Sequence, residues 1–369
     1  MGGMDVVVPP GDALRSVRGV RERAIGSALA AAVGDALGAP YEFLAPIPAT
    51  DDVDMVGGGL LGWAEGEWTD DTALAVVVLR AAVDAPGRPL TDETVLDAIA
   101  AGWFTWSIGA ADIGVLTSAV MRRSGELAAA SGRAVPAATD LRCAAQEVHE
   151  QLDRSGGNGA LLRVHAGVLP ALAAEDDVLE ESVLALCRLT HTDPEAQEAC
   201  VLWGFAVREA ILTGRLDVRS GLERLPEERR DVWCERLARA EASDPAELGR
   251  NGWVVRALQA AWSAIHRAGP VPEGRFAQRA WLVDVLDAAV RSGFDTDTVS
   301  CIAGSLAGAA VGPGAVPPEW RRDLHGWPGY DADDLVALVQ RALPADAEDI
   351  PGRTSRTSPG GPESEEAGR

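Results

Sequence analysis

Two runs of small residues at helical spacing, one near each end of the chain, constrain the fold more than any other feature. They are Gly26, Ala30, Gly34 and Gly38 in the first run, and Ser300, Gly304, Gly308 and Gly312 in the second. Residues four apart share one face of a helix, and small side chains let another backbone come close to that face. Because glycine inside a helix costs about 1 kcal/mol relative to alanine, we expect a packing role for both runs.

We therefore predict that a helix over residues 23–37 packs closely, and antiparallel, against the helix that carries the second run. This arrangement would place the end of the first helix beside the start of the second, and would bring Glu42 near Asp297. The alternative is that each small-residue face packs against some other helix. An abundance of Ala and Leu with 5% aromatic residues favours an all-α fold as well.

Two acidic stretches that lie far apart in the chain each precede an apolar run. They are Trp68-Thr69-Asp70-Asp71-Thr72 and Asp295-Thr296-Asp297-Thr298. In the second, Thr298 is placed like the N-cap of a helix, with both aspartates on the turn before it. Carboxylates and hydroxyls are the hard oxygen ligands that Mg²⁺, Mn²⁺ or Ca²⁺ prefer. Either stretch alone is typical of ordinary helix capping, but together they can supply the two sides of a two-metal site.

The chain of 369 residues has no obvious internal linker, so we expect a single all-helical domain over residues 21–343. Residues 1–20 are predicted to form a loose leader. Residues 344–369 are rich in Pro, Gly, Ser, Glu and Arg, a composition typical of a disordered tail.

The net charge and the cysteine pattern limit the classes of binding partner and the cellular compartment that we expect. With 33 basic and 56 acidic residues the formal net charge is −23, which disfavours nucleic acid and anionic membranes as general partners. Five scattered cysteines without a Cys-x-x-Cys motif fit a reducing compartment. We find neither a secretory signal nor an apolar run of the roughly 20 residues that span a bilayer, so a cytoplasmic location is predicted.

Three further segments contain candidate site residues. Asp112 lies in a Gly/Ala-rich loop, where an aspartate is most often a turn or cap residue. Ser155-Gly156-Gly157-Asn158-Gly159 is a glycine-rich turn before an apolar run, and such a turn can present N–H groups to a pyrophosphate, although a plain loop has the same composition. His191 precedes a helix start at Asp193-Pro194, where a histidine usually has a structural role.

The order of these segments resembles the ADP-ribosylglycohydrolase family. Six motifs carry the resemblance, which runs from about Arg23 to about Leu343: Gly34-Asp-Ala-Leu-Gly-Ala-Pro-Tyr-Glu42, Trp68-Thr-Asp-Asp-Thr72, Gly157-Asn-Gly-Ala-Leu-Leu-Arg163, Leu189-Thr-His-Thr-Asp-Pro194, Asp295-Thr-Asp-Thr298, and Ile302-Ala-Gly-Ser-Leu-Ala-Gly-Ala309 with Val316-Pro-Pro-Glu-Trp320.

The resemblance implies a compact multi-helix domain with a binuclear metal cleft at its centre. It implies two Mg²⁺ ions, with Mn²⁺ as an alternative, held by Thr69, Asp70, Asp71, Asp295, Asp297 and Thr298. It also implies that Ser155, Gly157, Asn158, Gly159 and His191 contact the substrate.

The reaction that the resemblance implies is hydrolysis of the glycosidic bond between ADP-ribose and an acceptor, such as an arginine side chain of a modified protein. A small ADP-ribose conjugate is the other substrate class. Such a bond breaks through an oxocarbenium-like state that needs a carboxylate as acid or base. Glu42 is the first candidate and Asp112 the second, while Asp35 could hold a ligand in place.

Two other functions stay open at the level of the sequence. One is an ADP-ribose-binding protein without turnover, and the other is a hydrolase of a free ADP-ribose-type nucleotide. The sequence also departs from the common family pattern, because Phe294 stands where a small residue often precedes the aspartate and Leu162 replaces a frequent methionine. The acceptor preference is therefore the property that Phe294 would affect.

Overall fold

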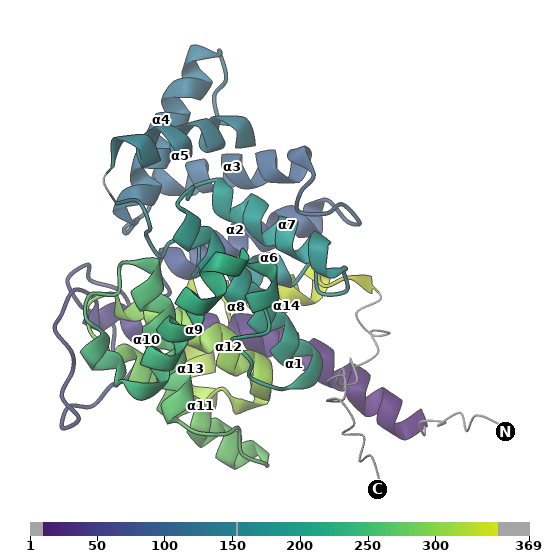
Figure 1. The fold of residues 1–369 in the computed structure, drawn as a ribbon, viewed down its shortest axis with the longest axis vertical. Helices are drawn as coiled ribbons and strands as arrows, with labels where there is room; N and C mark the ends of the chain where they lie inside the picture. The colour runs from purple at the N-terminus through teal and green to yellow at the C-terminus, as the bar shows by residue number, and fades with distance from the viewer. Residues whose placement is uncertain (1–9, 153, 346–369) are drawn as a thin grey trace, which may run out of the picture.

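The computed structural model of the protein describes residues 10–152 and 154–345 (Figure 1). Regular structure in these residues is almost entirely helical, which confirms the predicted all-α class. The helices are α1 (Pro10–Gly38), α2 (Asp70–Asp84), α3 (Glu93–Ser107), α4 (Val115–Ala130), α5 (Ala138–Gln151), α6 (Val164–Val168), α7 (Asp176–Arg188), α8 (Pro194–Thr213), α9 (Glu227–Ala242), α10 (Val254–Arg267), α11 (Arg275–Val290), α12 (Thr296–Val311), α13 (Pro318–Asp323) and α14 (Ala332–Ala342).

Short elements complete the described part of the chain. Four 3₁₀ turns cover Ala39–Tyr41, Leu222–Arg224, Pro245–Leu248 and Pro313–Ala315. The strands β1 (His325–Gly326) and β2 (Tyr330–Asp331) pair antiparallel, with His325 opposite Asp331. No helix in the described residues combines the length and the hydrophobicity needed to cross a membrane.

Helices α1 and α12 pack antiparallel at the centre of the molecule, as the small-residue runs predict (Figure 1). A Cβ atom added at Gly26 would meet the backbone of Gly308, and one added at Gly34 would meet Ser300, in each case at less than 3.0 Å. The Ser300 hydroxyl donates to the Gly34 carbonyl at 2.6 Å. The two backbones are therefore closer than any side chain larger than hydrogen would permit at these positions.

The same pairing continues to the end of α1. Gly38 faces Asp297, where an added Cβ would lie 2.5 Å from the Asp297 Cα. The Thr296 hydroxyl donates to the Gly38 carbonyl at 2.8 Å. The C-terminal end of α1 is thus fixed beside the N-terminal end of α12, which sets where the following 3₁₀ turn and Glu42 can go.

The other helices surround this pair. In Figure 1, α3, α4 and α5 form an upper group above α2, α6 and α7, while α10 and α11 pack against α12 and α9 packs against α10. The buried apolar residues form one continuous core that includes Trp103, Trp203 and Trp233. Trp103 and Trp106 are both buried, as expected of core residues.

Two predicted helix starts differ from the structure. Helix α1 begins at Pro10, so part of the expected leader is helical, while residues 1–9 lie outside the described residues. Helix α12 begins at Thr296 with Asp295 in the N-cap position, three residues before the predicted N-cap at Thr298. Most of the expected tail, from residue 346 onward, also lies outside the described residues.

Candidate functional site

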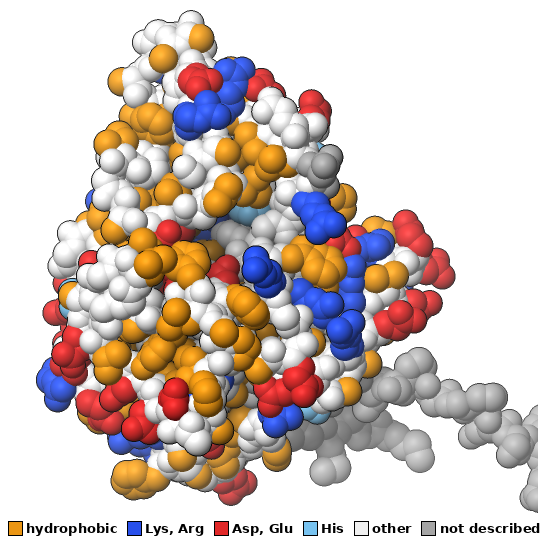
Figure 2. Space-filling view, turned by 90° about the vertical axis from the view of Figure 1, so that its left-hand side faces the viewer, with side chains coloured by type: hydrophobic (Ala, Val, Ile, Leu, Met, Phe, Trp, Pro, Cys, Tyr) orange, Lys and Arg blue, Asp and Glu red, His pale blue; other side chains and the backbone are white. Residues whose placement is uncertain are grey.

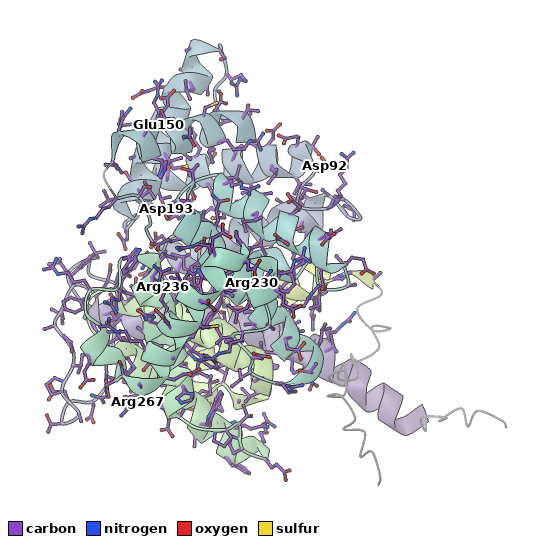
Figure 3. All side chains as sticks on the ribbon, viewed as in Figure 1. Asp92, Glu150, Asp193, Arg230, Arg236 and Arg267 are labelled. Atoms are coloured by element: carbon purple, nitrogen blue, oxygen red, sulfur yellow. The ribbon has the colours of Figure 1, made fainter. Side chains whose placement is uncertain are left out.

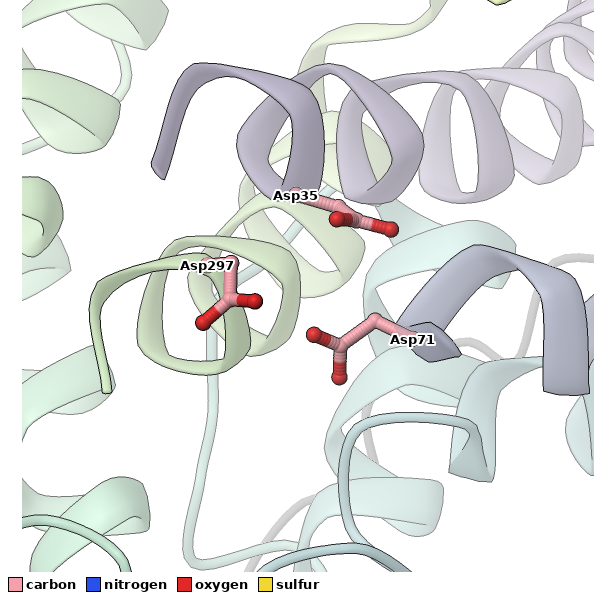
Figure 4. Close-up of side chains that lie close together, drawn as sticks. All are labelled: Asp35, Asp71 and Asp297. Atoms are coloured by element: carbon pink, nitrogen blue, oxygen red, sulfur yellow. The ribbon is translucent and has the colours of Figure 1, made fainter. Parts of the chain in front are cut away.

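Three carboxylates from three helices meet where α1, α2 and α12 come together. Asp35 of α1, Asp71 of α2 and Asp297 of α12 are buried, and each offers a carboxylate oxygen within 4.8 Å of the other two. Figure 4 shows the three side chains directed toward one another from their separate helices. The two acidic stretches of the sequence therefore do converge, because α1 and α12 pack side by side and α2 begins next to them.

Two threonine hydroxyls add oxygen atoms to this cluster. Thr69 Oγ1 lies 3.5 Å from Asp71 Oδ2 and 3.3 Å from Asp297 Oδ2. Thr298 Oγ1 lies 3.2 Å from both carboxylate oxygens of Asp71. None of these carboxylates takes part in an ion pair within the described part of the chain. The cluster is thus a buried set of hard oxygen donors without a basic side chain to balance it, which is the environment that suits a divalent cation.

Asp35 holds the start of α2 in place. Its carboxylate accepts hydrogen bonds from the Thr69 and Thr72 backbone N–H groups, both at 2.9 Å, and from the Thr72 hydroxyl at 2.6 Å. Burial raises the pKa of Asp35 to about 6, and these hydrogen bonds oppose the increase. Asp35 therefore orients the residues of the first acidic stretch, as the sequence analysis expected.

A second carboxylate group lies next to the first and shares Asp297 with it. Glu42 and Asp112 each place a carboxylate oxygen within 4.8 Å of one of Asp297. The proximity of Glu42 to Asp297 was predicted from the antiparallel packing and is confirmed. Glu42 is only 8% exposed, and its Oε2 atom is buried with no hydrogen-bond partner in the described residues. An unpartnered buried carboxylate oxygen is costly, so it indicates a group that receives a ligand.

Backbone hydrogen bonds join the segment that follows Glu42 to Phe294, the residue that precedes Asp295. The Phe43 N–H donates to the Phe294 carbonyl at 2.6 Å, and the Phe294 N–H donates to the Leu44 carbonyl at 2.7 Å. The φ angles of Phe43 and Phe294 are 66° and 63°, and they are the only non-glycine residues in the described chain with positive φ. Such conformations cost about 1–3 kcal/mol each and persist only where the surroundings enforce them. The sequence indicated a special role for Phe294 but carried no signal for its pairing with Phe43 and Leu44.

Asp295 lies on the turn before α12, as predicted, and lines the same cleft as Asp297. It belongs to neither of the two carboxylate groups among the described residues, because it lies at the N-cap of α12 and not inside the first turn. Its side chain accepts from Asn158 Nδ2 at 2.8 Å, and its backbone N–H donates to Asn251 Oδ1 at 3.0 Å. Asn251 was missed, although a buried Asn before Gly252 at the start of an apolar helix is a recognisable signal for such a contact.

A cleft of about 530 Å³ opens above the carboxylates, and the hollow near the centre of Figure 2 lies on the same side of the molecule. It collects all the predicted catalytic and substrate-contacting residues and four of the six predicted metal ligands. Its lining includes Glu42, Asp70, Asp112, Ser155, Gly157, Asn158, Gly159, His191, Asp295, Asp297 and Thr298. Thr69 and Asp71 do not line the cleft, but they contact residues that do.

The glycine-rich turn differs from its predicted form. No regular helix follows it directly, because residues 159–163 form further turns and α6 begins only at Val164. The Ser155 hydroxyl is bonded to the His149 ring. Gly157 instead pairs with Trp253, and the Val254 N–H donates to the Gly156 carbonyl at 2.9 Å. The turn therefore reaches the cleft through its pairing with the start of α10 and not as a helix N-terminus.

His191 is held by a short chain of hydrogen bonds from inside the protein. Arg163, which is fully buried, donates to the Thr190 hydroxyl at 2.5 Å, and that hydroxyl lies 2.7 Å from His191 Nδ1. Burial, followed by repulsion from Arg163, lowers the pKa of His191 to about 3. A neutral imidazole whose Nδ1 accepts from Thr190 carries its proton on Nε2, the atom nearest Gly157.

The electrostatics of the cleft follow from the crowding of acidic groups. Burial, and then repulsion from Asp112, raise the pKa of Glu42 to about 9 and that of Asp70 to about 8. Burial and neighbouring carboxylates raise the pKa values of Asp71 and Asp297 well above the ordinary range for aspartate. Both effects penalise negative charge, and a bound cation would remove the penalty.

Comparison with known proteins agrees with this architecture. Residues 16–351 match the model of the ADP-ribosylglycohydrolase family, so the chain belongs to this family of hydrolases. The chain is 27% identical over 319 residues to the ADP-ribosyl-[dinitrogen reductase] glycohydrolase of Rhodospirillum rubrum, covering 83% of this chain and 91% of the relative. It is 28% identical over 343 residues to the ADP-ribosylarginine hydrolase Tri1 of Pseudomonas putida (strain GB-1), covering 89% of this chain and 81% of the relative.

The fold is similar to a solved structure described as an ADP-ribosylglycohydrolase-related protein complex. The TM-score is 0.62 at 27% sequence identity, and the match covers 88% of this chain and 98% of the other. The family resemblance predicted from the six sequence motifs is thereby confirmed.

Proposed function

We propose that the protein removes ADP-ribose from a modified arginine side chain by hydrolysis of the glycosidic bond, with two divalent cations as cofactors. The observation that carries the proposal is the placement of the Glu42 carboxyl, buried and unpartnered on one side, within 4.8 Å of Asp112 and Asp297 in the wall of a cleft. Membership of the family and the names of the two relatives support the same reaction, and the name of the Pseudomonas putida relative supports arginine as the acceptor.

The oxygen donors at the floor of the cleft fit hard cations such as Mg²⁺, with Mn²⁺ as the alternative. Thr69, Asp70, Asp71, Asp297 and Thr298 would hold them, and Asp295 would join after release from Asn158. When bound, such cations supply positive charge that orients ribose hydroxyls and stabilises charge that develops in the reaction. They also counter the repulsion that an acidic cleft exerts on the pyrophosphate of ADP-ribose.

Glu42 acts as the acid or base in this proposal. Its raised pKa of about 9 keeps the carboxyl protonated near neutral pH in the metal-free protein, and nearby cations would lower that value. Glu42 can thus protonate the leaving nitrogen or activate water, and Asp112 is placed to share that proton. The Gly157–Gly159 turn and His191 would hold the ADP-ribose, with His191 Nε2–H as a donor to its oxygens.

Product analysis with a defined substrate tests the proposal. An arginine-ADP-ribosylated peptide is incubated with the protein and Mg²⁺, and the products are separated by chromatography. We expect free ADP-ribose together with the unmodified peptide. Tight binding without release would instead indicate an ADP-ribose-binding protein. Cleavage at a phosphate would indicate a hydrolase of the free nucleotide.

A cytoplasmic location is also part of the proposal. The five cysteines form no disulfide, and Cys187, Cys200 and Cys301 are buried as small core residues. Reduced thiols of this kind suit a reducing compartment, where ADP-ribosylated proteins would be the partners.

A further inference from the structure

A groove separate from the catalytic cleft is lined by arginines. Its volume is about 350 Å³, and the residues around it come from α9 and from the start of α10. They are Val232, Glu235, Arg236, Arg239, Trp253, Val255, Arg256 and Gln259. Figure 2 shows basic side chains gathered beside the central hollow, and Figure 3 labels Arg236, one of the residues that line the groove. Such a concentration is unexpected on a chain whose net charge is −23.

Two of these arginines have no acidic partner of their own. Arg236 is bonded to Glu195, but Arg239 and Arg256 form no ion pair within the part of the chain that the structure describes. Arg256 only donates to Gln259, at 3.1 Å. Burial, followed by repulsion from Arg239 and Arg236, lowers the pKa of Arg256. Glu235 also lines the groove, and Arg236 is paired with Glu195, so Arg239 and Arg256 are the two lining cations without an ion pair in the described residues.

Trp253 joins the groove to the catalytic cleft. Its side chain is 39% exposed, and its indole N–H donates to Glu195 at 3.1 Å. The Arg236 and Arg256 guanidinium groups lie 5.6 and 5.9 Å from the centre of its ring. On the other side, the Trp253 backbone pairs with Gly157, and Gly252 and Gly157 both line the cleft. The segment Gly252-Trp253 therefore lines both the arginine groove and the catalytic cleft.

We propose that this groove binds an acidic stretch of the same polypeptide whose modified arginine occupies the catalytic cleft. The inference rests on the proposed function and adds the class of protein that the enzyme selects. Guanidinium groups bind carboxylates in a fork geometry, and an exposed tryptophan supplies contact area at low entropy cost. The net negative charge of the remaining chain repels acidic proteins in other orientations, so the groove would also fix the direction of approach.

The experiment compares three substrates on the wild-type protein with Mg²⁺. They are free ADP-ribosylarginine, an arginine-modified peptide with glutamates on one flank, and the same peptide with glutamines there. We expect kcat/KM to be several-fold higher for the acidic peptide than for the neutral one, mainly through KM. That advantage should shrink as salt rises, because exposed charge pairs are screened. Equal kcat/KM for the two peptides at low salt would overturn the inference.

A charge reversal provides the second measurement. The double variant Arg239→Glu/Arg256→Glu should raise KM for the acidic peptide roughly 10-fold, while leaving the kcat/KM for free ADP-ribosylarginine unchanged. A peptide with lysines on the flank should become the better substrate of this variant. The matched control is Arg80→Glu/Arg215→Glu, which makes the same charge change at exposed arginines without ion pairs in the described residues.

The outcomes separate the two levels of the proposal. If the wild type releases ADP-ribose from none of the three substrates, the proposed function fails. If it releases ADP-ribose but the groove variant and the control variant affect the acidic peptide equally, the groove has no role in recognition. A short oligonucleotide coupled to ADP-ribosylarginine tests the partner class. If the groove variant lowers kcat/KM for this conjugate and not for the acidic peptide, the partner class is wrong.

Discussion

Glu42 is the residue to which the proposed mechanism assigns the proton transfer. Its position follows from Gly38, which lets α1 end against Asp297, and from the Phe43–Phe294 backbone pair that holds the next residue. These contacts leave one carboxylate oxygen of Glu42 buried without a hydrogen-bond partner in the described residues, which is unusual for a buried polar atom.

We predict that Glu42→Gln lowers kcat by roughly 10²–10⁴-fold, because it removes a group that can exchange a proton while keeping its size. Binding of ADP-ribose should change little, since the amide still fits the same space. Single-turnover kinetics and calorimetric titration with ADP-ribose measure the two effects. An unchanged kcat would remove Glu42 from the mechanism. Asp112→Asn is the companion variant, and we expect a smaller loss from it.

We expect the buried carboxylate of Asp71 to lower the stability of the folded protein when no cation is bound. We predict that Asp71→Asn is more stable than the wild type in the presence of a chelator, because one buried negative charge is removed from beside Asp35 and Asp297. Magnesium at about 100 times its Kd should stabilise the wild type by about 2.7 kcal/mol and the variant far less. Thermal unfolding with and without Mg²⁺ gives both numbers. A variant that is less stable in chelator and still stabilised by Mg²⁺ would contradict the ligand assignment.

At the scale of elements, the antiparallel contact of α1 and α12 positions the site. We predict that Gly34→Ala destabilises the fold by roughly 1–3 kcal/mol and weakens Mg²⁺ binding, because the added methyl group meets the Ser300 backbone, which cannot move without shifting α12. The measurement is urea unfolding combined with a Mg²⁺ titration.

Gly125→Ala in α4 is the control for this change. The added methyl group there meets only the Phe104 ring, a partly buried side chain that can turn away, so we expect stability within about 1 kcal/mol of the wild type. Equal losses for the two variants would mean that the backbone contact between α1 and α12 has no special importance.

The sequence was sufficient to predict which elements meet but not how each one starts. Small residues four apart fixed the pairing of α1 with α12, because no larger side chain fits between them. The start of α12 was misplaced because Thr298 and Asp295 are both good cap residues, and the contact that decides between them is Asn251, a residue 44 positions away. The turn after Ser155 was misjudged for the same reason, since its pairing with Trp253 is a long-range contact.

At the scale of the whole molecule, buried ionisable groups couple stability to pH. His165 lies in the core, and burial lowers its pKa to about 4, below the ordinary value of 6.5. The folded protein therefore resists protonation while the unfolded chain accepts it. Stability from this residue is present at neutral pH and is lost as the pH falls below about 6.5.

We predict that the wild type loses roughly 2 kcal/mol relative to His165→Leu between pH 7 and pH 5. Titration of the acidic cleft is common to both proteins and cancels in the comparison. Urea unfolding at the two pH values tests the prediction. A constant difference between the two proteins would show that His165 titrates normally.

The overall architecture could be predicted because it depends on sequence patterns that extend along most of the chain. Helical periodicity, two acidic stretches and six motifs in order define the family, and their convergence on one cleft follows from the packing of α1 against α12. The Arg163–Thr190–His191 chain and the arginine groove were not predicted, because each joins residues whose spacing in the sequence carries no signal.

The most direct test of the central claim is the release of ADP-ribose from an arginine-ADP-ribosylated protein, measured across a Mg²⁺ titration for the wild type and for Asp297→Asn. The account predicts that the wild type is active with Mg²⁺ and inactive in chelator, and that Asp297→Asn stays inactive at every Mg²⁺ concentration. Full activity of the wild type in chelator, or of Asp297→Asn at saturating Mg²⁺, would contradict it.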